Sequence, residues 1–260
     1  MIDDWLHELS TSWLVVAVFA VTLAIAAAIY AVVVALARGE RGRAFKTVSP
    51  GLLPPMGLVF GLVVGFLAAQ VWSDGDRAHQ AVNREASSLR SVVLLAAEFP
   101  GEREARMQSL VRRHIREAVT REWPHMAEGG VTLSVVPRAL GDLLELALRL
   151  RPEGPGQEVA QRELVTSLEN ALDARRQRII VSESSVNWAK WGAVFALAVL
   201  TLLAVAFVHS DNRLGGGIAM ALFASAVAVC VLMIATHDRP FSGPFRVSPD
   251  VLLEVEPAQP

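Results

Sequence analysis

Four long stretches of this 260-residue chain contain no Asp, Glu, Lys or Arg, and this pattern limits the possible folds more than any other feature. The stretches are Leu9 to Ala37, Thr47 to Ser73, Trp191 to Ser210 and Leu214 to His237. A bilayer core about 30 Å thick requires roughly 20 apolar residues of helix, and each stretch supplies that length. The pattern predicts membrane-spanning helices and excludes an ordinary soluble enzyme, a disordered charged tail and a secreted disulfide scaffold.

The first stretch could also be a cleaved signal peptide, but its flank does not fit one. Asp3, Asp4 and Glu8 stand where a signal peptide needs basic residues, and the apolar run is too long. We therefore predict an all-α, four-helix transmembrane protein with a helical soluble domain inserted between spans 2 and 3. The expected segments are an N-terminal arm (1–12), transmembrane helix 1 (13–37), a basic link (38–50), transmembrane helix 2 (54–72), the helical soluble domain (74–190), transmembrane helices 3 (191–209) and 4 (217–236), and a C-terminal tail (237–260).

The segment 74–190 has the periodicity of a helical bundle. Apolar residues recur at spacings of three and four over 78–89, 107–119 and 140–148. The second of these helices is expected to end at Trp123-Pro124. From Gln157 the pattern continues without Pro or Gly, so one long helix is expected to run into the third span. The segment from Gly129 to Pro137 is rich in β-branched side chains and is expected to form a loop or a short strand.

The distribution of Lys and Arg leaves the sidedness of the protein open. The two short links that would lie on one side of the membrane hold five of these residues, against two in the arm and tail, which places the soluble domain and both termini outside. If the Lys and Arg residues at the membrane flanks of the soluble domain are included, the side with the arm and tail holds nine of them. This count favours the opposite orientation, with the soluble domain and both termini inside. Lys46 and Lys190 are the only lysines among many arginines, which is typical of a GC-rich bacterial source. The expected location is the bacterial cell (inner) membrane, with several spans.

The sequence offers no recognisable catalytic or cofactor-binding motif. Cys230 is the only cysteine and lies within a span, so no internal disulfide, thiolate metal site or dithiol pair is expected. None of the six histidines lies in an HExxH pattern, and His114, beside several arginines, is interpreted as a surface histidine on a helix. Gly-rich phosphate-binding loops and nucleophile elbows are missing from the sequence. We expect no enzymatic activity, no metal, no cofactor and no nucleic-acid partner.

The second span carries Gly57, Gly61 and Gly65 at intervals of four, followed by Phe66. This spacing lines small residues along the helix, which favours close packing of helices in a membrane. The same residues could also line a pore in an oligomer, and the two interpretations are compatible. The charge-free stretches lack the ionisable groups that proton relays place inside the membrane, which disfavours a proton-coupled pump. Gly216, in the link before the fourth span, is expected to tolerate a larger side chain.

The tail begins with Asp238, Arg239, Pro240 and Phe241, directly after the fourth span. Pro240 disfavours a helical backbone at Arg239, so the fourth helix is expected to end near Asp238. One interpretation is a helix stop with Phe241 and Phe245 anchored at the membrane interface. The other is a cluster of residues at the mouth of a pore, in which Asp238 and Arg239 pair with each other or with neighbouring helix ends.

Most of the chain from about residue 50 resembles a bacterial membrane-protein family of unknown function called bestrophin-like. The resemblance rests on the segment from the end of the second span through Val82 and Glu85-Ala86 to Leu89-Arg90, on Glu122-Trp123-Pro124, on the run Arg175-Arg176-Gln177-Arg178 and most specifically on the DRPFSG tail at 238–243. It implies two spans, a helical insertion and two further spans. It also implies a homo-oligomer, a pentamer being the implied size, with the second helix near the axis. The family name implies an anion channel, although an acidic calcium-binding cluster and the motifs of bestrophins proper are missing.

Two functions from different classes follow from these observations. A homo-oligomeric ion channel would arrange Gly57, Gly61, Gly65 and Phe66 around a central hole in the lipid bilayer and pass inorganic ions. A non-conducting signalling or scaffold protein would instead use the segment 74–190 to bind a ligand or a partner. Ion flux through liposomes distinguishes the two.

Overall fold

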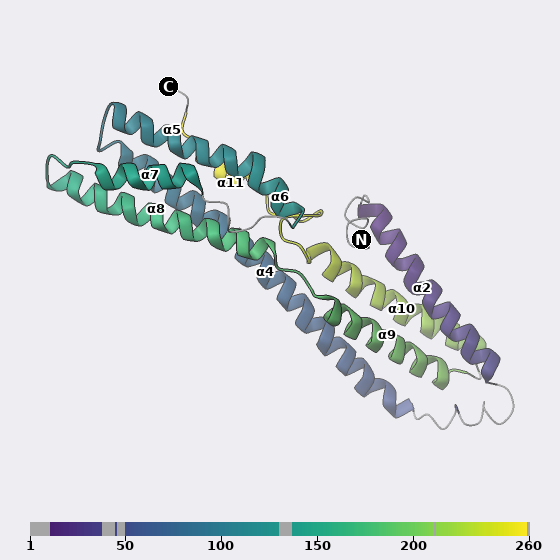
Figure 1. Ribbon diagram of the computed structural model, residues 1–260. Helices are drawn as coiled ribbons and strands as arrows, with labels where there is room; N and C mark the ends of the chain where they lie inside the picture. Colours follow the sequence, from purple (N-terminus) through teal and green to yellow (C-terminus); the bar gives the residue numbers. More distant parts are fainter. Residues whose placement is uncertain (1–10, 38–44, 46–49, 130–136, 211, 259–260) are drawn as a thin grey trace. The chain divides into compact units, whose positions relative to one another are not determined.

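The computed structural model describes residues 11–37, 45, 50–129, 137–210 and 212–258, and within these ranges the regular elements are all helical (Figure 1). The predicted all-α fold is confirmed. In chain order the elements are α2 (Thr11–Leu36), η1 (Pro50–Leu52), α4 (Leu53–Ala96), α5 (Glu102–Glu117), the π-helical turn η2 (Ala118–Glu122), α6 (Trp123–Ala127), α7 (Arg138–Arg149), α8 (Pro155–Ser182), α9 (Trp188–Val208), α10 (Arg213–His237) and α11 (Asp250–Leu253).

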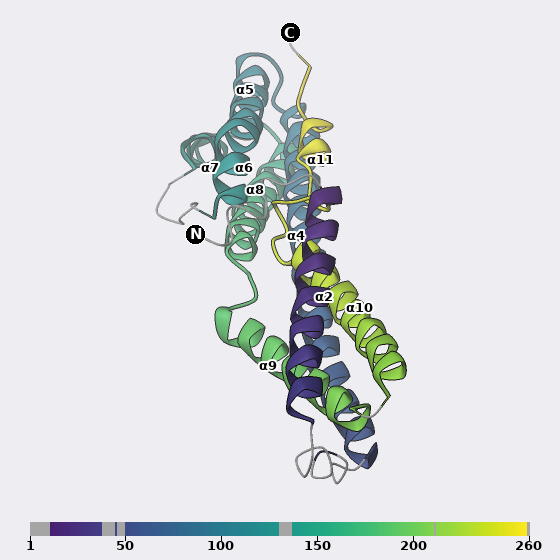
Figure 2. The same cartoon turned by 90° about the vertical axis from the view of Figure 1, so that its right-hand side faces the viewer.

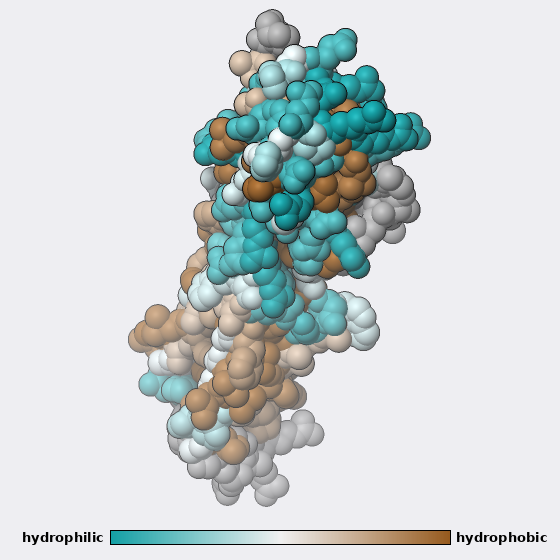
Figure 3. All heavy atoms as spheres, turned by 90° about the vertical axis from the view of Figure 1, so that its left-hand side faces the viewer, coloured by the Kyte–Doolittle hydropathy of each residue, from teal (hydrophilic) through white to brown (hydrophobic). Residues whose placement is uncertain are grey.

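The chain divides into two compact units, which differ in surface character. The membrane unit comprises Met1–Trp72 and Ser185–Asp238, and the helical unit comprises Ser73–Ser184 and Arg239–Pro260. Four helices, α2, α4, α9 and α10, are long enough and apolar enough to cross a membrane. Figure 3 shows mainly hydrophobic side chains on the membrane unit and many hydrophilic ones on the helical unit. The protein is therefore a multi-pass membrane protein with a helical segment between the second and third spans.

Two apolar clusters hold the membrane unit together. α2 runs alongside α10 in both Figure 1 and Figure 2, and it also contacts α9. The cluster between these three helices includes Ala26, Val33, Leu202, Met220 and Ala224. The second cluster joins the beginning of α4 to α9 and α10 and includes Phe60, Val64, Leu67, Val194 and Ile234. Small and branched side chains fill these contacts and leave the outer helix faces to lipid.

α4 is one unbroken helix of 44 residues that belongs to both units. At 1.5 Å per residue it is about 66 Å long, roughly twice the thickness of a bilayer core. The polar sequence after Trp72 does not interrupt it, because polar side chains are tolerated on the exposed side of a helix. Asp74 instead lies one turn before Arg77, and its Oδ1 accepts a hydrogen bond from Nη1 at 3.3 Å.

The prediction of one long helix running from Gln157 into the third span is wrong. α8 ends at Ser182, and α9 begins at Trp188. Asn187 caps α9, since its side-chain oxygen accepts a hydrogen bond from the backbone N–H of Lys190 at 3.0 Å. An asparagine cap starts a new helix without any need for Pro or Gly.

The helix that was expected to end at Trp123-Pro124 continues to Ala127. The π-helical turn η2 makes this possible, because the N–H of Trp123 donates to the carbonyl oxygen of Ala118, five residues earlier. A wide turn of this kind is rare, and in proteins it is often found at functional sites. The loop or strand predicted from Gly129 to Pro137 lies mostly outside the described residues.

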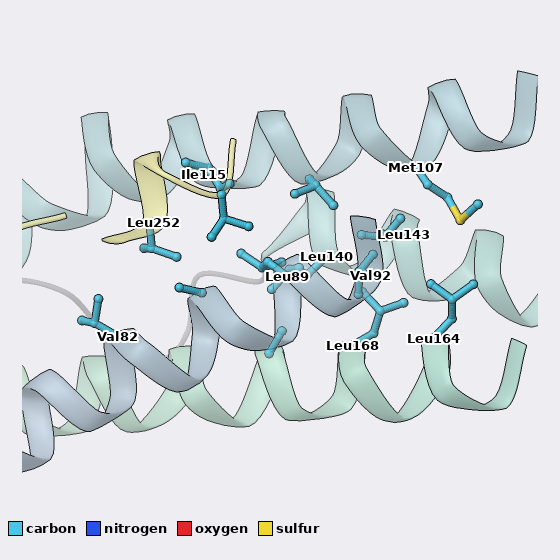
Figure 4. Packing of buried hydrophobic residues seen from close by; sticks show 14 of the residues in the cluster. Val82, Leu89, Val92, Met107, Ile115, Leu140, Leu143, Leu164, Leu168 and Leu252 are labelled. Carbon is cyan, nitrogen blue, oxygen red and sulfur yellow. The ribbon is translucent and has the colours of Figure 1, made fainter. Parts of the chain in front are cut away.

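The helical unit has a core to which α4, α5, α7, α8 and the C-terminal tail all contribute. Figure 4 shows Val82, Leu89 and Val92 of α4, Met107 and Ile115 of α5, Leu140 and Leu143 of α7, Leu164 and Leu168 of α8, and Leu252 of α11 directed toward one another. Three further tail residues, Phe241, Val247 and Val255, belong to the same cluster. The segment after α10 is therefore part of the helical core.

Single cysteines can test the four-span topology. In a background lacking Cys230, we expect cysteines replacing the exposed Glu128 and Ser248 to react with an impermeant thiol reagent from the same side of the membrane, because both belong to the helical unit. A cysteine replacing Leu214, which is 77% exposed at the start of α10, should react from the opposite side. Reaction of Leu214→Cys and Ser248→Cys from one side would mean that α10 does not cross the bilayer.

Candidate functional site

The most unusual feature of the helical unit is a set of charged side chains in its interior. We call it the buried charge cluster, and it consists of Glu85, His114, Glu122, Arg175 and Arg178. Glu85 and Arg178 are completely shielded from solvent, and His114 is 2% exposed. Charged groups are rarely buried unless they are paired, so their partners determine what the cluster can do.

Glu85 of α4 is bound by two side chains from different helices. Arg178 of α8 donates from Nε to Oε2 at 2.7 Å and from Nη2 to Oε1 at 3.2 Å. His114 of α5 lies with Nε2 at 2.8 Å from Oε1. Because an ionised carboxylate only accepts hydrogen bonds, Nε2 carries the proton in this contact. Glu85 thus ties together α4, α5 and α8.

Glu122, at the end of the π-helical turn, joins the two arginines of α8. Its Oε2 accepts from Arg178 Nη2 at 2.8 Å, and its Oε1 accepts from Arg175 Nε at 2.9 Å and Nη2 at 2.6 Å. The next residue, Trp123, places its ring under Arg178, with the guanidinium carbon 4.6 Å from the ring centroid. Cation–π contacts of this kind stabilise a desolvated arginine.

The helical spacing of the sequence explains why these groups meet. On α4, Glu85 falls between Val82 and Leu89 on the face that is otherwise apolar and buried. On α8, Arg175 and Arg178 continue a buried stripe at spacings of three and four, which starts at Ala160 and includes Leu164, Leu168 and Ala171. Each charged side chain therefore replaces an apolar one at a core position.

Burial and ion pairing shift the pKa values of the two carboxyl groups in opposite directions, and ion pairing has the larger effect. Burial would raise the pKa of Glu85, but the charge of Arg178 and the hydrogen bonds from His114 and Arg178 lower its pKa from 4.5 to about 2. Burial also opposes ionisation of Glu122, and Arg178 and Arg175 lower the pKa of that carboxyl group. The pKa of Arg178 is raised because the two carboxylates outweigh its burial. Both carboxylates therefore remain ionised and fully engaged at neutral pH.

We expect the protein to lose stability as the pH falls from about 4.5 to about 2. In this window the unfolded chain binds a proton at Glu85 that the folded chain excludes, so acid favours unfolding. The lowered pKa corresponds to about 3 kcal/mol of stability that is present above the window and lost below it. Urea unfolding of the full chain in detergent at several pH values measures this loss. Glu85→Gln should flatten the dependence, and an unchanged slope in that variant would contradict the assignment.

The resemblance to the family singles out Glu85, Glu122, Trp123, Pro124, Arg175 and Arg176 as site residues. Glu85, Glu122 and Arg175 belong to the cluster and Trp123 contacts it, but the other two do not. Arg176 is exposed on the outer side of α8, and Pro124 is exposed in the first turn of α6. Sequence reasoning did not include Arg178 among the site residues and interpreted His114 as a surface residue, which is wrong. The signal for His114 was its spacing, since it lies seven residues after the buried Met107 and three after the buried Val111.

The residues Asp238, Pro240 and Phe241 have different surroundings. The fourth helix ends at His237, as expected, and Asp238 accepts a hydrogen bond at Oδ1 from the N–H of Val186 at 2.6 Å. This hydrogen bond fixes the position of the segment that precedes α9. Phe241 is not an interface anchor, because it is 2% exposed and makes an edge-to-face contact with Trp123 at 5.7 Å between ring centroids. Pro240 is buried as well, and its carbonyl oxygen accepts from the N–H of Val247 at 2.8 Å.

Among the described residues, nothing packs directly against the glycines of α4. A Cβ atom added at Gly57, Gly61 or Gly65 would meet nothing within 4 Å, and Phe66 is 68% exposed. Gly216, by contrast, lies within α10 against Tyr30, and a Cβ there would come within 2.9 Å of the His209 carbonyl oxygen. The expectation that Gly216 tolerates a larger side chain is wrong.

Chemically, the buried charge cluster is suited to holding helices in place. Its carboxylates are neutralised by arginines, which leaves no free acid or base, and the described residues contain no group of three or more His, Cys, Asp or Glu side chains placed to bind a metal ion. Removing one member of a buried ion pair exposes its partner to an apolar environment, so each member depends on the others.

The comparisons with known proteins agree with this architecture. A family description, the Bestrophin-like domain, matches residues 16–252. A crystal structure of a bacterial bestrophin homolog from Klebsiella pneumoniae, in a variant form, is similar with a TM-score of 0.72 at 11% identity, over 92% of this chain and 96% of that one. A second structure of such a homolog from the same organism gives a TM-score of 0.67 at 11% identity, over 93% and 95% of the two chains. Curated proteins give no match.

At this identity the likeness to solved structures shows a shared fold. The family match is more informative because it spans the four candidate membrane helices almost completely, together with the buried charge cluster between the second and third of them. The chain belongs to the bestrophin-like family of membrane proteins.

Proposed function

We propose that the protein is a homo-oligomeric ion channel of the bacterial inner membrane, in which the first half of α4 from each copy lies near a common axis. The observation that carries this proposal is the open surface of α4 around Gly61 and Gly65. A helix that faces only lipid gains nothing from glycine, which weakens a helix by about 1 kcal/mol relative to alanine. Glycine is favourable, however, where it allows the backbone of a second helix to approach closely.

The side chains beside these glycines suit a narrow apolar passage. Leu58, Leu62 and Phe66 are 73%, 55% and 68% exposed, and none of them belongs to the cluster that joins α4 to α9 and α10. Rings of such residues around an axis form hydrophobic constrictions, which open and close to ions by wetting and drying. A channel of this kind needs no ionisable group inside the membrane.

A polar pair follows this apolar stretch at the end of the span. Lys190 at the start of α9 donates from Nζ to Oε1 of Gln70 on α4 at 2.6 Å. The pair borders a groove of about 220 Å³ whose other walls, including Val63, Phe66 and Leu67, are apolar. A lysine near the entrance of a passage raises the local concentration of anions. This placement supports an anion as the permeant species, as the family name implies.

Ion flux is the experiment that tests the proposal. The purified chain should have the mass of an oligomer by native mass spectrometry in detergent, with a pentamer as the size implied by the family. Reconstituted into liposomes, it should pass ions, and replacing chloride or sodium in the medium identifies the permeant ion. An oligomer that conducts nothing under varied voltage, calcium and pH would favour the signalling or scaffold function.

Gly61→Leu should disrupt the oligomer. A leucine at this position finds space within one chain, so the fold of the single chain should remain, but it would obstruct the proposed approach of a second copy. Overpacking of a helix contact costs about 1–3 kcal/mol, which is enough to shift assembly measurably. Size-exclusion chromatography with light scattering reports the change.

Gly192→Leu is the matched control, because Gly192 lies in α9 and its added Cβ also meets nothing within 4 Å. If Gly61→Leu and Gly192→Leu gave the same oligomer as the unmodified chain, the glycines of α4 would have no role in assembly.

A further inference from the structure

A groove lined mainly by arginine lies on the outer surface of the helical unit, away from the buried charge cluster. It has a volume of about 310 Å³ and runs along α5 and the π-helical turn. Its charged lining consists of Arg112, Arg113, Arg116 and Arg121, with Glu117 as the only acidic side chain. The whole chain has a net charge of −2, so this concentration of positive charge is local.

The spacing of the arginines is unfavourable for the helix itself. Arg112 and Arg116 are four residues apart, and Arg113 and Arg116 are three apart, so like charges meet on successive turns. Pairs of this kind destabilise a helix by about 0.2–0.5 kcal/mol each. The hydrophobic core does not require them, because Arg113, Arg116 and Arg121 are exposed.

The hydrogen bonds around the groove position the guanidinium groups without neutralising them all. Arg112 donates to the uncharged carbonyl oxygens of Pro257 and Ala258 at 3.2 and 2.6 Å. Arg113 pairs with Glu117 at 2.9 Å, and Arg116 pairs with Glu256 of the tail at 2.9 Å. Among the described residues, the guanidinium group of Arg121 has no hydrogen-bond or ion-pair partner, and only its backbone carbonyl oxygen is engaged, by His125 Nδ1 at 2.7 Å. Two of the four positive charges, those of Arg112 and Arg121, therefore have no carboxylate partner within the described part of the chain.

We infer that this groove binds a phosphate-bearing anion. A guanidinium group donates parallel hydrogen bonds that match the oxygens of phosphate, and several such groups along one groove suit an anion with more than one negative charge. The tail carbonyls hold Arg112 in place and reduce the entropy lost when an anion binds. The phosphate could belong to a free anion or to a lipid headgroup, since the recognising chemistry is the same.

Calorimetric titration of the purified full-length protein in neutral detergent with inorganic pyrophosphate tests the inference. We expect saturable binding that weakens as salt is added, because exposed charges are screened. Arg121→Ala should weaken binding by about tenfold, the usual effect of losing one hydrogen bond to a charged group. This substitution removes an exposed side chain and should leave the melting temperature unchanged. Arg113→Ala should weaken binding to a similar extent.

Arg149→Ala is the matched control, because Arg149 is an exposed arginine on α7 that pairs with Glu145, as Arg113 pairs with Glu117, but lies outside the groove. It should bind pyrophosphate as the unmodified protein does. A lack of binding, or an equal loss in Arg149→Ala and Arg121→Ala, would overturn the inference. A parallel titration with monomeric short-chain phosphatidylglycerol identifies the source: if it displaces pyrophosphate at lower concentration, the ligand is a lipid headgroup, and if pyrophosphate binds more tightly, the ligand is a free anion.

Discussion

Arg178→Met should lower the free energy of unfolding of the protein by about 3–5 kcal/mol, the usual effect of removing one partner from a buried ion pair. Arg178 is fully buried and supplies hydrogen bonds to both Glu85 and Glu122. Methionine fills a similar length but carries no charge, so Glu85 would keep His114 as its only partner. Urea unfolding of the full chain in detergent, followed by circular dichroism, measures the loss.

Arg176→Met is the control, since Arg176 lies two positions earlier on the same helix and is exposed. Its effect should stay within about 0.5 kcal/mol, as for most surface substitutions. A small effect of Arg178→Met, comparable to that of the control, would mean that the buried charge cluster does not stabilise the fold. The comparison also separates Arg178 from Arg176, of which only Arg176 was predicted from the sequence as a site residue.

Phe241→Ala should cost about 3–5 kcal/mol as well, because it creates a cavity in the core of the helical unit. Phe241 is 2% exposed and contacts the ring of Trp123, whose Nε1 donates to the Val247 carbonyl oxygen at 3.1 Å. Truncating the side chain removes both the aromatic contact and the support for this part of the tail. Thermal unfolding of the full chain in detergent reports the loss as a lower melting temperature.

Phe245→Ala, four residues further along the tail, should change stability little because Phe245 is 61% exposed. The pair of variants also tests the interpretation of Phe241 as a membrane anchor. If Phe241→Ala and Phe245→Ala were equally mild, the tail would not be part of the core.

The membrane helices could be predicted because charge is costly in lipid, and the sequence therefore marks each span by the absence of Asp, Glu, Lys and Arg. The junctions between spans and helical unit were harder. Ser73 to Asp76 has the composition of a loop but lies inside α4, while the segment before Asn187 has no Pro or Gly and yet separates α8 from α9. In both places, the outcome depends on tertiary contacts and caps that composition does not specify.

The buried charge cluster could be predicted only in part. Glu85, Glu122 and Arg175 were found through a resemblance to a family, and nothing in their local sequence shows that they touch. Their contacts join positions 29 to 93 residues apart, as between Glu85 and His114 or Glu85 and Arg178. Helix periodicity places position 178 on the core face of α8, but the charge of an arginine would assign this side chain to solvent. Only the packing of α4, α5 and α8 brings the opposite charges together.

The place of the tail in the helical core also fixes the order of events during synthesis. Phe241 and Leu252 fill positions among helices that are complete at Ser184, but the ribosome must first make the 54 residues of Ser185–Asp238. At about 5–20 residues per second this takes roughly 3–11 s. During that time, α5, α7 and α8 have been synthesised, but their shared core still lacks Phe241 and Leu252. The final fold of this segment therefore waits until the last two spans have been translated, and the early-made helices remain open to chaperones and proteases until then.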